Sequence, residues 1–389
     1  MQILGTPAPL FIFVIALSSM QSSAAQKRFT ATAADSTGSS TLRAVAVSEP
    51  LFGSPSTDAR AITRSAFRYR DHADLFAMQS PPPPKVSKPP KQKIERVTID
   101  PSMVGYIDDA GPRTEVRIRF DAAVHDDTPD RAEFFYSKCG CYRGLPTSNA
   151  AYDPDAPGPG PGIPQYVNFQ QLYLLGEYAP YKRLSVFSQI PIRWLQPHSA
   201  AGTAAAFASS DGISDLQLGL KFAVIVTPRT ILTAQLRSSL PTGDSRSGLG
   251  TNHASLEPEI LYSQHLSDRL TVEAEVGDTH PLGSSHGVPT SGSPGFAGDV
   301  FFYGVGPSYV AMKRENFKLA PVLELVGWNV ISGLATGRTD TAGVNIVNLK
   351  LGLRMQFGAH SSLYEGYGIA LTSQTWYREI FRTEYRYTF

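Results

Sequence analysis

The sequence is 389 residues long and carries 35 Lys and Arg against 34 Asp and Glu, so its net charge is close to zero. Because basic and acidic residues nearly cancel, the composition gives no reason to expect a nucleic-acid partner. Only two cysteines occur, Cys139 and Cys141, which excludes a disulfide framework that would hold the whole fold together.

The chain begins with an apolar run, Leu10 to Leu17, followed by small residues that end in Ser23, Ala24 and Ala25. This order is typical of a secretory signal peptide, so we predict that residues 1–25 are cleaved off after Ala25. The alternative, an N-terminal membrane anchor, needs about twenty apolar residues, and the run is shorter than that. The sequence therefore predicts an exported protein.

Residues 26–105 are rich in Ser, Thr, Ala and charge, and they contain the stretch SPPPPKVSKPPKQK. Consecutive prolines favour an extended polyproline II conformation and cannot supply a strand to a sheet. We therefore predict a disordered, Pro-rich periplasmic extension. A contact of its lysines (Lys85, Lys88, Lys91 and Lys93) with an anionic polymer such as the cell wall is the functional alternative.

The remaining residues, 106–389, contain segments in which apolar and polar residues alternate with the period of a β-strand. About twelve such segments recur, an even number, and many are long enough to cross a bilayer at a tilt. The predicted strands are 113–123, 168–179, 182–195, 213–226, 229–240, 254–265, 268–279, 299–311, 316–328, 344–357, 361–372 and 376–389.

Short and long connections alternate between these strands. Tight turns occur near residues 228, 267 and 359, whereas long polar links, rich in Gly or Pro, span 124–167, 196–212, 241–253, 280–298 and 329–343. A meander with short periplasmic turns and longer outer loops produces this rhythm. A soluble Greek-key sandwich gives no reason for it.

The faces of the predicted strands support a membrane location. In VNLKLGLRMQF, for example, Leu349, Leu351 and Leu353 alternate with Lys350 and Arg354. After the signal peptide no stretch approaches the length of a membrane-spanning helix, so insertion must use strands. We therefore expect an all-β fold, a transmembrane antiparallel meander β-barrel of about twelve strands in the bacterial outer membrane, with an apolar exterior and a wet interior.

The chain ends on WYREIFRTEYRYTF, which reads as a last strand with two different faces. One face carries Tyr377, Phe381, Tyr385, Tyr387 and Phe389, and the other carries Trp376, Arg378, Arg382, Glu384 and Arg386. This strand is expected to pair with the first one, because an open edge cannot be hydrated within a bilayer. The alternating aromatics and the terminal Phe also resemble the assembly signal of bacterial outer-membrane barrels, which implies the barrel assembly machinery as a partner.

Four motifs in the middle of the chain carry a family resemblance: GISDLQLGLKF, LPTGD, GLGTNHASLEP and LSDRL. With them, residues 210 to 330 resemble the outer-membrane proteins associated with the meta-pathway of phenol degradation, and the likeness extends more loosely to Phe389. The resemblance implies a transporter-like outer-membrane protein, and it supplies no catalytic residue.

The predicted ring places strands 254–265 and 268–279 opposite strands 376–389 and 113–123, and the polar faces of the two pairs differ in charge. The first pair offers glutamates and the second mainly arginines, so a field across the pore would favour small polar or zwitterionic solutes. The alternative is that these charges pair across the interior and plug it. The candidate pore-lining residues are Arg117, Arg119, Lys221, Glu257, Glu259, Glu273, Glu275, Lys350, Arg354, Arg378, Arg382 and Arg386.

The expected function is that of a porin-like channel for the passive passage of small solutes, in contact with outer-membrane lipid. A structural barrel that only displays surface loops is the alternative. An outer-membrane lipid hydrolase is a remote third reading, based on His253 and Ser255, which are two residues apart as in the outer-membrane phospholipase. Because Ser255 shares a face with Glu257 and Glu259, it would point into the lumen and away from lipid, so no enzyme is expected.

The two cysteines, in YSKCGCYRG, form a disulfide-capable loop in an oxidising compartment. Cys139 and Cys141 could also bridge to another chain, whereas two thiols without a nearby His are too few ligands for a metal site. No cofactor and no metal are expected.

Overall fold

The structure is a computed structural model that describes residues 101–128, 140–200, 207–283, 296–335 and 341–389. The predicted signal peptide and the predicted extension up to residue 100 lie outside these residues. Within the described part of the chain, no helix is long and apolar enough to cross a membrane.

The described residues form strands joined by links and two short 3-10 helices. The strands of the ring are β1 (Glu115–Asp126), β2 (Tyr166–Tyr181), β3 (Leu184–His198), β5 (Leu216–Val226), β6 (Thr230–Leu240), β7 (Ala254–His265), β8 (Leu270–Leu282), β9 (Val300–Tyr309), β11 (Phe317–Val330), β12 (Asn345–Phe357), β13 (Ser361–Ala370) and β14 (Glu379–Thr388). The short strands β4 (Ser210–Ile213) and β10 (Met312–Arg314) pair with β3 and β11, and the helices are η1 (Gly140–Gly144) and η2 (Ser245–Ser247).

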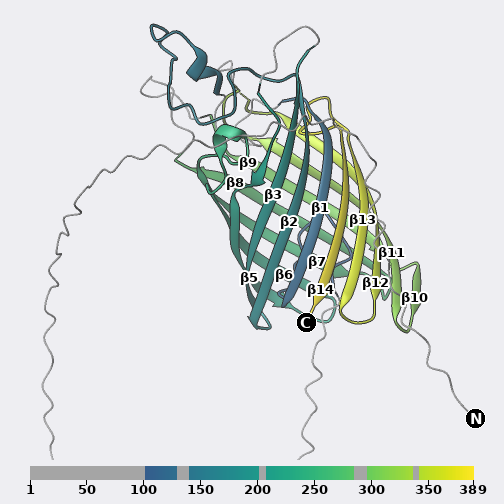
Figure 1. Cartoon of the computed structure of the whole chain (residues 1–389). Coiled ribbons are helices and arrows are strands. Elements are labelled where there is room, and N and C mark those ends of the chain that lie inside the picture. Colours follow the sequence, from purple (N-terminus) through teal and green to yellow (C-terminus); the bar gives the residue numbers. More distant parts are fainter. Residues whose placement is uncertain (1–100, 129–139, 201–206, 284–295, 336–340) are drawn as a thin grey trace, which may run out of the picture. The chain divides into compact units, whose positions relative to one another are not determined.

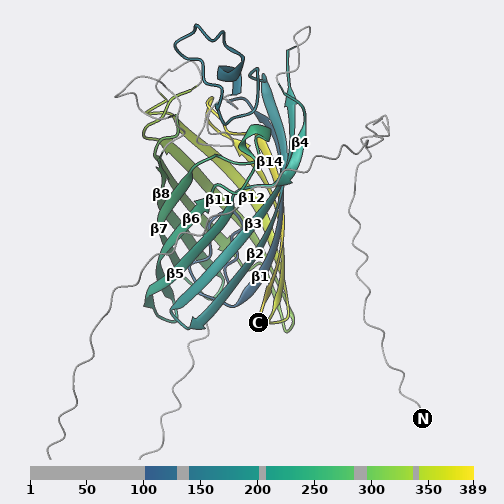
Figure 2. The same cartoon turned by 60° about the vertical axis from the view of Figure 1, so that its left-hand side comes forward.

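Each strand of the ring pairs antiparallel with the strands before and after it, and β14 pairs with β1 to close the barrel. The closing ladder runs from Glu115 opposite Thr388 to Val124 opposite Glu379. Figures 1 and 2 show the tilted strands side by side around one barrel. The prediction of a closed antiparallel barrel of about twelve strands is therefore confirmed.

The two ends of the barrel differ. Turns 227–229, 266–269 and 358–360 lie at one end, together with the C-terminus, and we name it the short-turn end. The opposite end, which we name the long-link end, carries the links that contain η1 and η2. The predicted alternation of short and long connections is thus present in the structure.

One predicted strand is interrupted in the structure, and another ends two residues early. The predicted strand 213–226 is broken at Ser214 and Asp215, where the regular pairing with β3 is interrupted between β4 and β5 although the Ser214 N–H still donates to the Pro191 carbonyl. The predicted strand 299–311 ends at Tyr309, and the chain resumes pairing as β10. An alternating pattern cannot reveal such breaks, because it records the side-chain faces and not the backbone pairing.

The exterior of the barrel is apolar and the interior is polar. Leu351 is 57% exposed on β12, whereas its neighbour Lys350 is 2% exposed. The same contrast recurs on β14, where Phe381 is exposed and Arg382 is buried. Large apolar side chains exposed in this way on a closed barrel are what a bilayer-facing surface requires.

Replacing Leu351 by arginine should destabilise the barrel by about 2–4 kcal/mol, because it places a charge near the middle of the lipid-facing band. Leu282 lies at the long-link end of β8 and is also exposed, so Leu282→Arg should cost only about 0–1 kcal/mol. Urea titration of both variants, folded into lipid vesicles, measures the difference. Equal losses would contradict a lipid-facing position for Leu351.

The start of the last strand differs from the expected pattern. β14 begins at Glu379, so the period of two does not extend back to residues 376–378. Tyr377 is consequently buried in the interior, although its predicted face was the outer one. At the other end, the Phe389 N–H donates to the Thr114 carbonyl at 2.9 Å and completes the closing ladder.

Candidate functional site

A segment of the chain that precedes β1 lies inside the barrel. We name residues 101–113 the interior loop; Met103, Val104, Ile107 and Ala110 in it are 7% exposed or less. The guanidinium of Arg386 contacts both the Ser102 carbonyl at 3.4 Å and the Asp109 carboxylate at 3.3 Å, so the two arms of the loop meet there. The predicted boundary between extension and barrel, after residue 105, falls within this loop.

One wall of the barrel accepts hydrogen bonds from the main chain of the loop. Glu273 accepts from the N–H groups of Met103 and Val104, at 3.3 and 3.4 Å. Glu324 accepts from Gly105, Tyr106 and Ile107 at 3.1, 2.8 and 2.9 Å, and Glu275 accepts from Asp108 at 2.9 Å. Three carboxylates on β8 and β11 thus satisfy every N–H group from Met103 to Asp108.

Basic side chains from other strands donate to the carbonyl groups of the same loop. Arg354 donates to the carbonyls of Met103 and Val104 at 3.2 and 2.6 Å, and Arg382 donates to that of Gly105 at 2.7 Å. On the second arm, Lys221 donates to the Asp109 carbonyl at 3.0 Å. Charge-assisted bonds of this kind are stronger than neutral ones, so the loop is held firmly on both sides.

Side chains of the loop fill specific sites on the wall. The Tyr106 ring has the Lys350 ammonium 3.7 Å and the Arg382 guanidinium 4.0 Å from its centroid, which is cation–π geometry. Met103, Val104 and Ile107 pack in one apolar cluster with β11, β13 and the ring of Tyr106. The β11 and β13 residues of this cluster are Ala320, Val322, Val326 and Tyr364.

Gly105 is the point at which the loop comes closest to the wall. A Cβ atom at this position would lie 2.2 Å from Cε1 of Tyr364, which is 0% exposed and donates its hydroxyl to Glu324. No side chain fits there unless the loop or the ring moves.

Asp108 joins the loop to a charged cluster on β6, β7 and β8. Its carboxylate pairs with Arg237 and accepts a bond from the Gln235 amide at 3.0 Å. Carboxylate oxygens of Asp108, Glu259 and Glu275 lie within 4.8 Å of one another. Arg237 also pairs with Glu259 at 3.3 Å, so its guanidinium offsets part of the negative charge.

A cavity opens above the interior loop, towards the long-link end. Its volume is about 370 Å³, and Tyr106 and Asp108 of the loop form part of its lining. Glu257, Glu259 and Glu275 line it from β7 and β8, and Arg119 and Arg193 line it from β1 and β3. The cavity also has aromatic walls, from Phe169, Tyr173, Phe302, Trp328, Trp376 and Tyr377.

A space of about 110 Å³ lies beside Tyr106 of the loop. Two further spaces beside and below the loop are much smaller. A space of about 30 Å³ lies between Pro101, Asp109 and the turns of the short-turn end, and one of about 20 Å³ lies between Asp108, Lys221 and Arg237. Each holds little more than a single water molecule. Among the described residues, the loop therefore separates the large cavity from the short-turn end.

The structure places the sequence-predicted site residues on the inner face, with one difference. Arg117, Lys221, Glu257, Glu259, Glu273, Lys350, Arg354, Arg382 and Arg386 are 9% exposed or less, and Arg119 and Glu275 are partly buried. Arg378 precedes β14, its side chain is 62% exposed, and it pairs with Asp127 at 2.8 Å at the rim. The strand begins one residue too late to turn Arg378 inward.

The predicted separation of charge is only part of the arrangement. β7 and β8 do lie across the ring from β14 and β1, but many basic side chains pair within their own wall. Arg382 forms a two-pronged pair with Asp121 at 2.7 Å, and Glu384 lies 2.9 Å from Arg354 and 3.1 Å from Arg386. Among the described residues, the interior loop fills the space between the two walls, and the charged groups of one wall do not pair directly with those of the other.

Sequence reasoning missed Glu324 and the interior loop. Glu324 is 0% exposed and makes four of the bonds described above, yet it stands alone in the apolar run APVLELVGW. The available signal was that Ala320, Val322 and Val326, the inner positions on either side of Glu324 on β11, are all apolar. An apolar inner face requires a covering segment.

His253 and Ser255, the pair considered for lipid hydrolysis, both line the large cavity and not the exterior. The Nδ1 atom of His253 bonds the Thr251 carbonyl at 2.9 Å, and burial lowers the pKa of His253. Ser255 is 5% exposed and lies opposite Ser239 of β6. Neither side chain faces lipid, which a lipid hydrolase requires.

The cysteine loop is described only in part. Cys141 lies in η1 and packs beside a small apolar cluster that includes Tyr142 and Phe296. Cys139 lies outside the described residues, so the disulfide between Cys139 and Cys141 stays a prediction.

Three of the four motifs behind the family resemblance meet at one carboxylate near the cavity. Asp215, from GISDL, accepts the N–H of Gly243 of LPTGD at 2.9 Å, and it accepts the N–H and hydroxyl of Thr251 of GLGTNH at 2.8 and 2.9 Å. The carboxylate therefore fixes the link 241–253 over the break between β4 and β5. Within the described residues, these motif residues therefore hold the link 241–253 in place.

Replacing Asp215 by asparagine should free the link 241–253, because an amide NH₂ would face donors that now share a carboxylate. The expected loss is about 1–3 kcal/mol of local stability. Hydrogen exchange at Gly243 and Thr251 measures it, with the exposed Asp211 changed to asparagine as the matched control. Unchanged exchange in Asp215→Asn would contradict this role.

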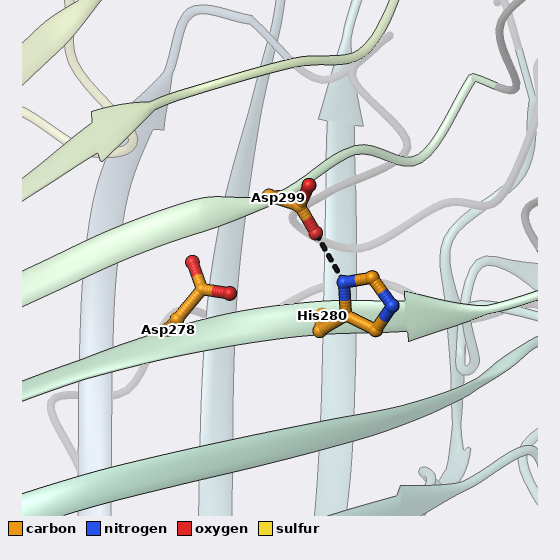
Figure 3. A group of neighbouring side chains, drawn as sticks. All are labelled: Asp278, His280 and Asp299. Atoms are coloured by element: carbon orange, nitrogen blue, oxygen red, sulfur yellow. Dashed lines mark hydrogen bonds and ion pairs between the residues drawn. The ribbon is translucent and has the colours of Figure 1, made fainter.

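A second group of potential metal ligands lies near the long-link end, where β8 ends and β9 begins. Figure 3 shows Asp278 and His280 on β8 and Asp299 next to them, directly before β9. One ligand atom of each residue lies within 4.8 Å of the other two. His280 Nδ1 bonds Asp299 at 2.6 Å, and the His280 side chain is 56% exposed. This hydrogen-bonded pair accounts for the grouping, and we assign no metal to it.

The fold and its interior define a class of protein: a closed membrane-type β-barrel with an apolar exterior and a charged interior that is occupied by its own chain. No family model matches the chain, and no curated protein matches it.

Comparison with solved structures gives an outer-membrane channel, an autotransporter β domain and a porin. The chain is similar to an outer-membrane channel from Pseudomonas putida F1, with 16% identity over 75% of this chain and 100% of that one, at a TM-score of 0.47. It is similar to the β domain of the Bordetella autotransporter BrkA, with 15% identity over 72% of this chain and 100% of that one, at a TM-score of 0.41. For the KdgM porin, the identity is 8% over 70% of this chain and 99% of that one, and the TM-score is 0.36.

Proposed function

We propose that the chain is a porin-like channel of the bacterial outer membrane for the passive passage of small polar solutes, and that the interior loop holds it closed. The observation that carries the proposal is the cavity of about 370 Å³, which leads from the long-link end to the loop inside a sealed, polar barrel. The loop is the one described segment between that cavity and the short-turn end.

The cavity lining supports the choice of solute. Carboxylates of β7 and β8 and guanidinium groups of β1 and β3 line it together, so solutes with both charges, or with strong dipoles, find partners on two sides. The resemblance of residues 210–330 to the outer-membrane proteins associated with the meta-pathway of phenol degradation also supports a transporter. That association, export with cleavage after Ala25, and assembly by the barrel assembly machinery are parts of the proposal.

Single-channel recording in planar bilayers tests the proposal. The full chain is expected to show long closed periods with rare, discrete openings, and a salt gradient should give a reversal potential near zero because both charges line the path. A variant with a displaced interior loop should conduct more often. If neither protein conducts although both show the mobility shift of a folded barrel on unheated gels, display without transport is favoured instead.

The lipid-hydrolase alternative has its own control. Purified protein should release no fatty acid from phospholipid vesicles, and the His253→Ala and Ser255→Ala variants should therefore have no activity to lose. Release that either substitution abolishes would contradict the channel as the sole function.

A further inference from the structure

The walls of the barrel recognise the main chain of the interior loop more than its side chains. Six consecutive N–H groups, from Met103 to Asp108, are accepted by Glu273, Glu324 and Glu275. Carbonyls of the same stretch accept from Arg354 and Arg382. Because every peptide carries these N–H and C=O groups, the acceptors and donors would serve other peptides as well.

The side-chain contacts add a preference for particular residue types. The apolar inner face of β11 contacts three apolar side chains of the loop, Met103, Val104 and the aliphatic Ile107. The aromatic Tyr106 lies against Lys350 and Arg382, and the acidic Asp108 pairs with Arg237. The site therefore fits the pattern apolar, apolar, Gly, aromatic, aliphatic, acidic.

The position of the loop arms shows how such a peptide would reach the site. Pro101, Ser102 and Asp109 line the small space at the short-turn end, whereas Tyr106 and Asp108 line the large cavity. Both arms of the loop thus lie at the short-turn end and its tip faces the cavity. A separate peptide of the same pattern would occupy the site from that end.

We propose that the lower interior of this barrel is a peptide-binding site, filled in cis by residues 101–113 and able to take a looped peptide of the same pattern in trans. The inference rests on the proposed channel and names short peptides as its solute class. The carboxylates of Glu273, Glu324 and Glu275 bind the N–H groups of the peptide, and Arg354 and Arg382 bind its carbonyls.

The experiment uses the full chain with its own loop expelled. Gly105→Ala removes the space for the close approach to Tyr364, and Ile107→Asp adds a buried charge, so the double variant empties the site. A fluorescent synthetic peptide, PSMVGYIDDAGPR, should bind this variant saturably and should lower its conductance when added at the short-turn side. The unmutated protein, whose site is filled, should not bind it.

Ester analogues of the peptide distinguish backbone recognition from nonspecific binding. Replacing the N–H groups of Tyr106 and Ile107 by ester oxygens removes two donors to Glu324 without added bulk, and should weaken binding by at least about tenfold. The control is an ester at Asp109, because neither the Asp109 N–H nor the Asp108 carbonyl bonds a barrel side chain among the described residues; it should change affinity by less than about twofold.

The outcomes separate this inference from the channel. Absence of saturable binding to the emptied variant, or equal binding of the peptide and its Tyr106 and Ile107 esters, overturns the peptide site even if the variant conducts. Saturable, ester-sensitive binding to a variant that never conducts supports the peptide site and contradicts the channel. Binding together with block of conductance supports both.

Discussion

Replacing Gly105 by alanine is expected to open the barrel. The added Cβ would lie 2.2 Å from the buried ring of Tyr364, so the loop cannot keep its bonds to Glu324. Overpacking of this kind costs about 1–3 kcal/mol, which corresponds to a roughly 5- to 150-fold rise in the ratio of open to closed channels. Single-channel recordings of the variant and the unmutated protein measure the ratio directly.

Gly176→Ala is the matched control for this experiment. Gly176 lies on β2, and a Cβ atom there would meet nothing within 4 Å, so its substitution should leave the open fraction unchanged. Both variants should keep the unheated gel mobility of the folded barrel, because neither substitution removes a backbone hydrogen bond between strands. An open fraction in Gly105→Ala equal to that of the control would contradict a closing role for the interior loop.

A disulfide between the loop and the wall is expected to lock the barrel shut. A Cβ atom on Gly304 would lie 2.9 Å from Cγ1 of Ile107, which is one bond from the Ile107 Cβ atom, so the Cβ atoms of cysteines at both positions would lie no farther apart than the roughly 4.5 Å that a disulfide allows. With Cys139 and Cys141 changed to serine, the oxidised Ile107→Cys/Gly304→Cys protein should show almost no openings. Adding a reducing agent should restore the openings seen before oxidation.

The single variants Ile107→Cys and Gly304→Cys serve as controls, since neither can form the bond and a reducing agent should not affect them. Openings that persist in the oxidised double variant, with the bond verified by mass spectrometry, would show that solutes pass around the loop. That result would remove the loop from the gate while leaving the channel itself untouched.

The barrel could be predicted because apolar and polar residues alternate regularly along its strands. Each strand must face lipid on one side and polar groups on the other, so residues such as Lys350 and Leu351 alternate whatever their neighbours are. Closure follows from the same physics, since an unpaired edge in a bilayer leaves backbone groups unsatisfied. Strand ends were less certain, as Arg378 and Tyr377 show, because the pattern does not record where pairing begins.

The interior loop could not be predicted in the same way. PSMVGYIDDAGPR has neither a strand period nor a helix period, and it follows a Pro-rich stretch that suggests an unstructured segment. Its order comes from partners far along the chain, such as Glu324 and Arg354, and no local pattern encodes contacts across more than two hundred residues. Only the apolar inner face of β11 gave an indirect sign of it.

The meeting of both loop arms at Arg386 has a consequence for the mechanics of gating. A segment that passed through the barrel from one mouth to the other would have to be unthreaded before it could leave. The interior loop enters and leaves the barrel through the same mouth, so it can withdraw as a unit while every inter-strand ladder stays intact. Repeated emptying and refilling is therefore compatible with a barrel that never unfolds.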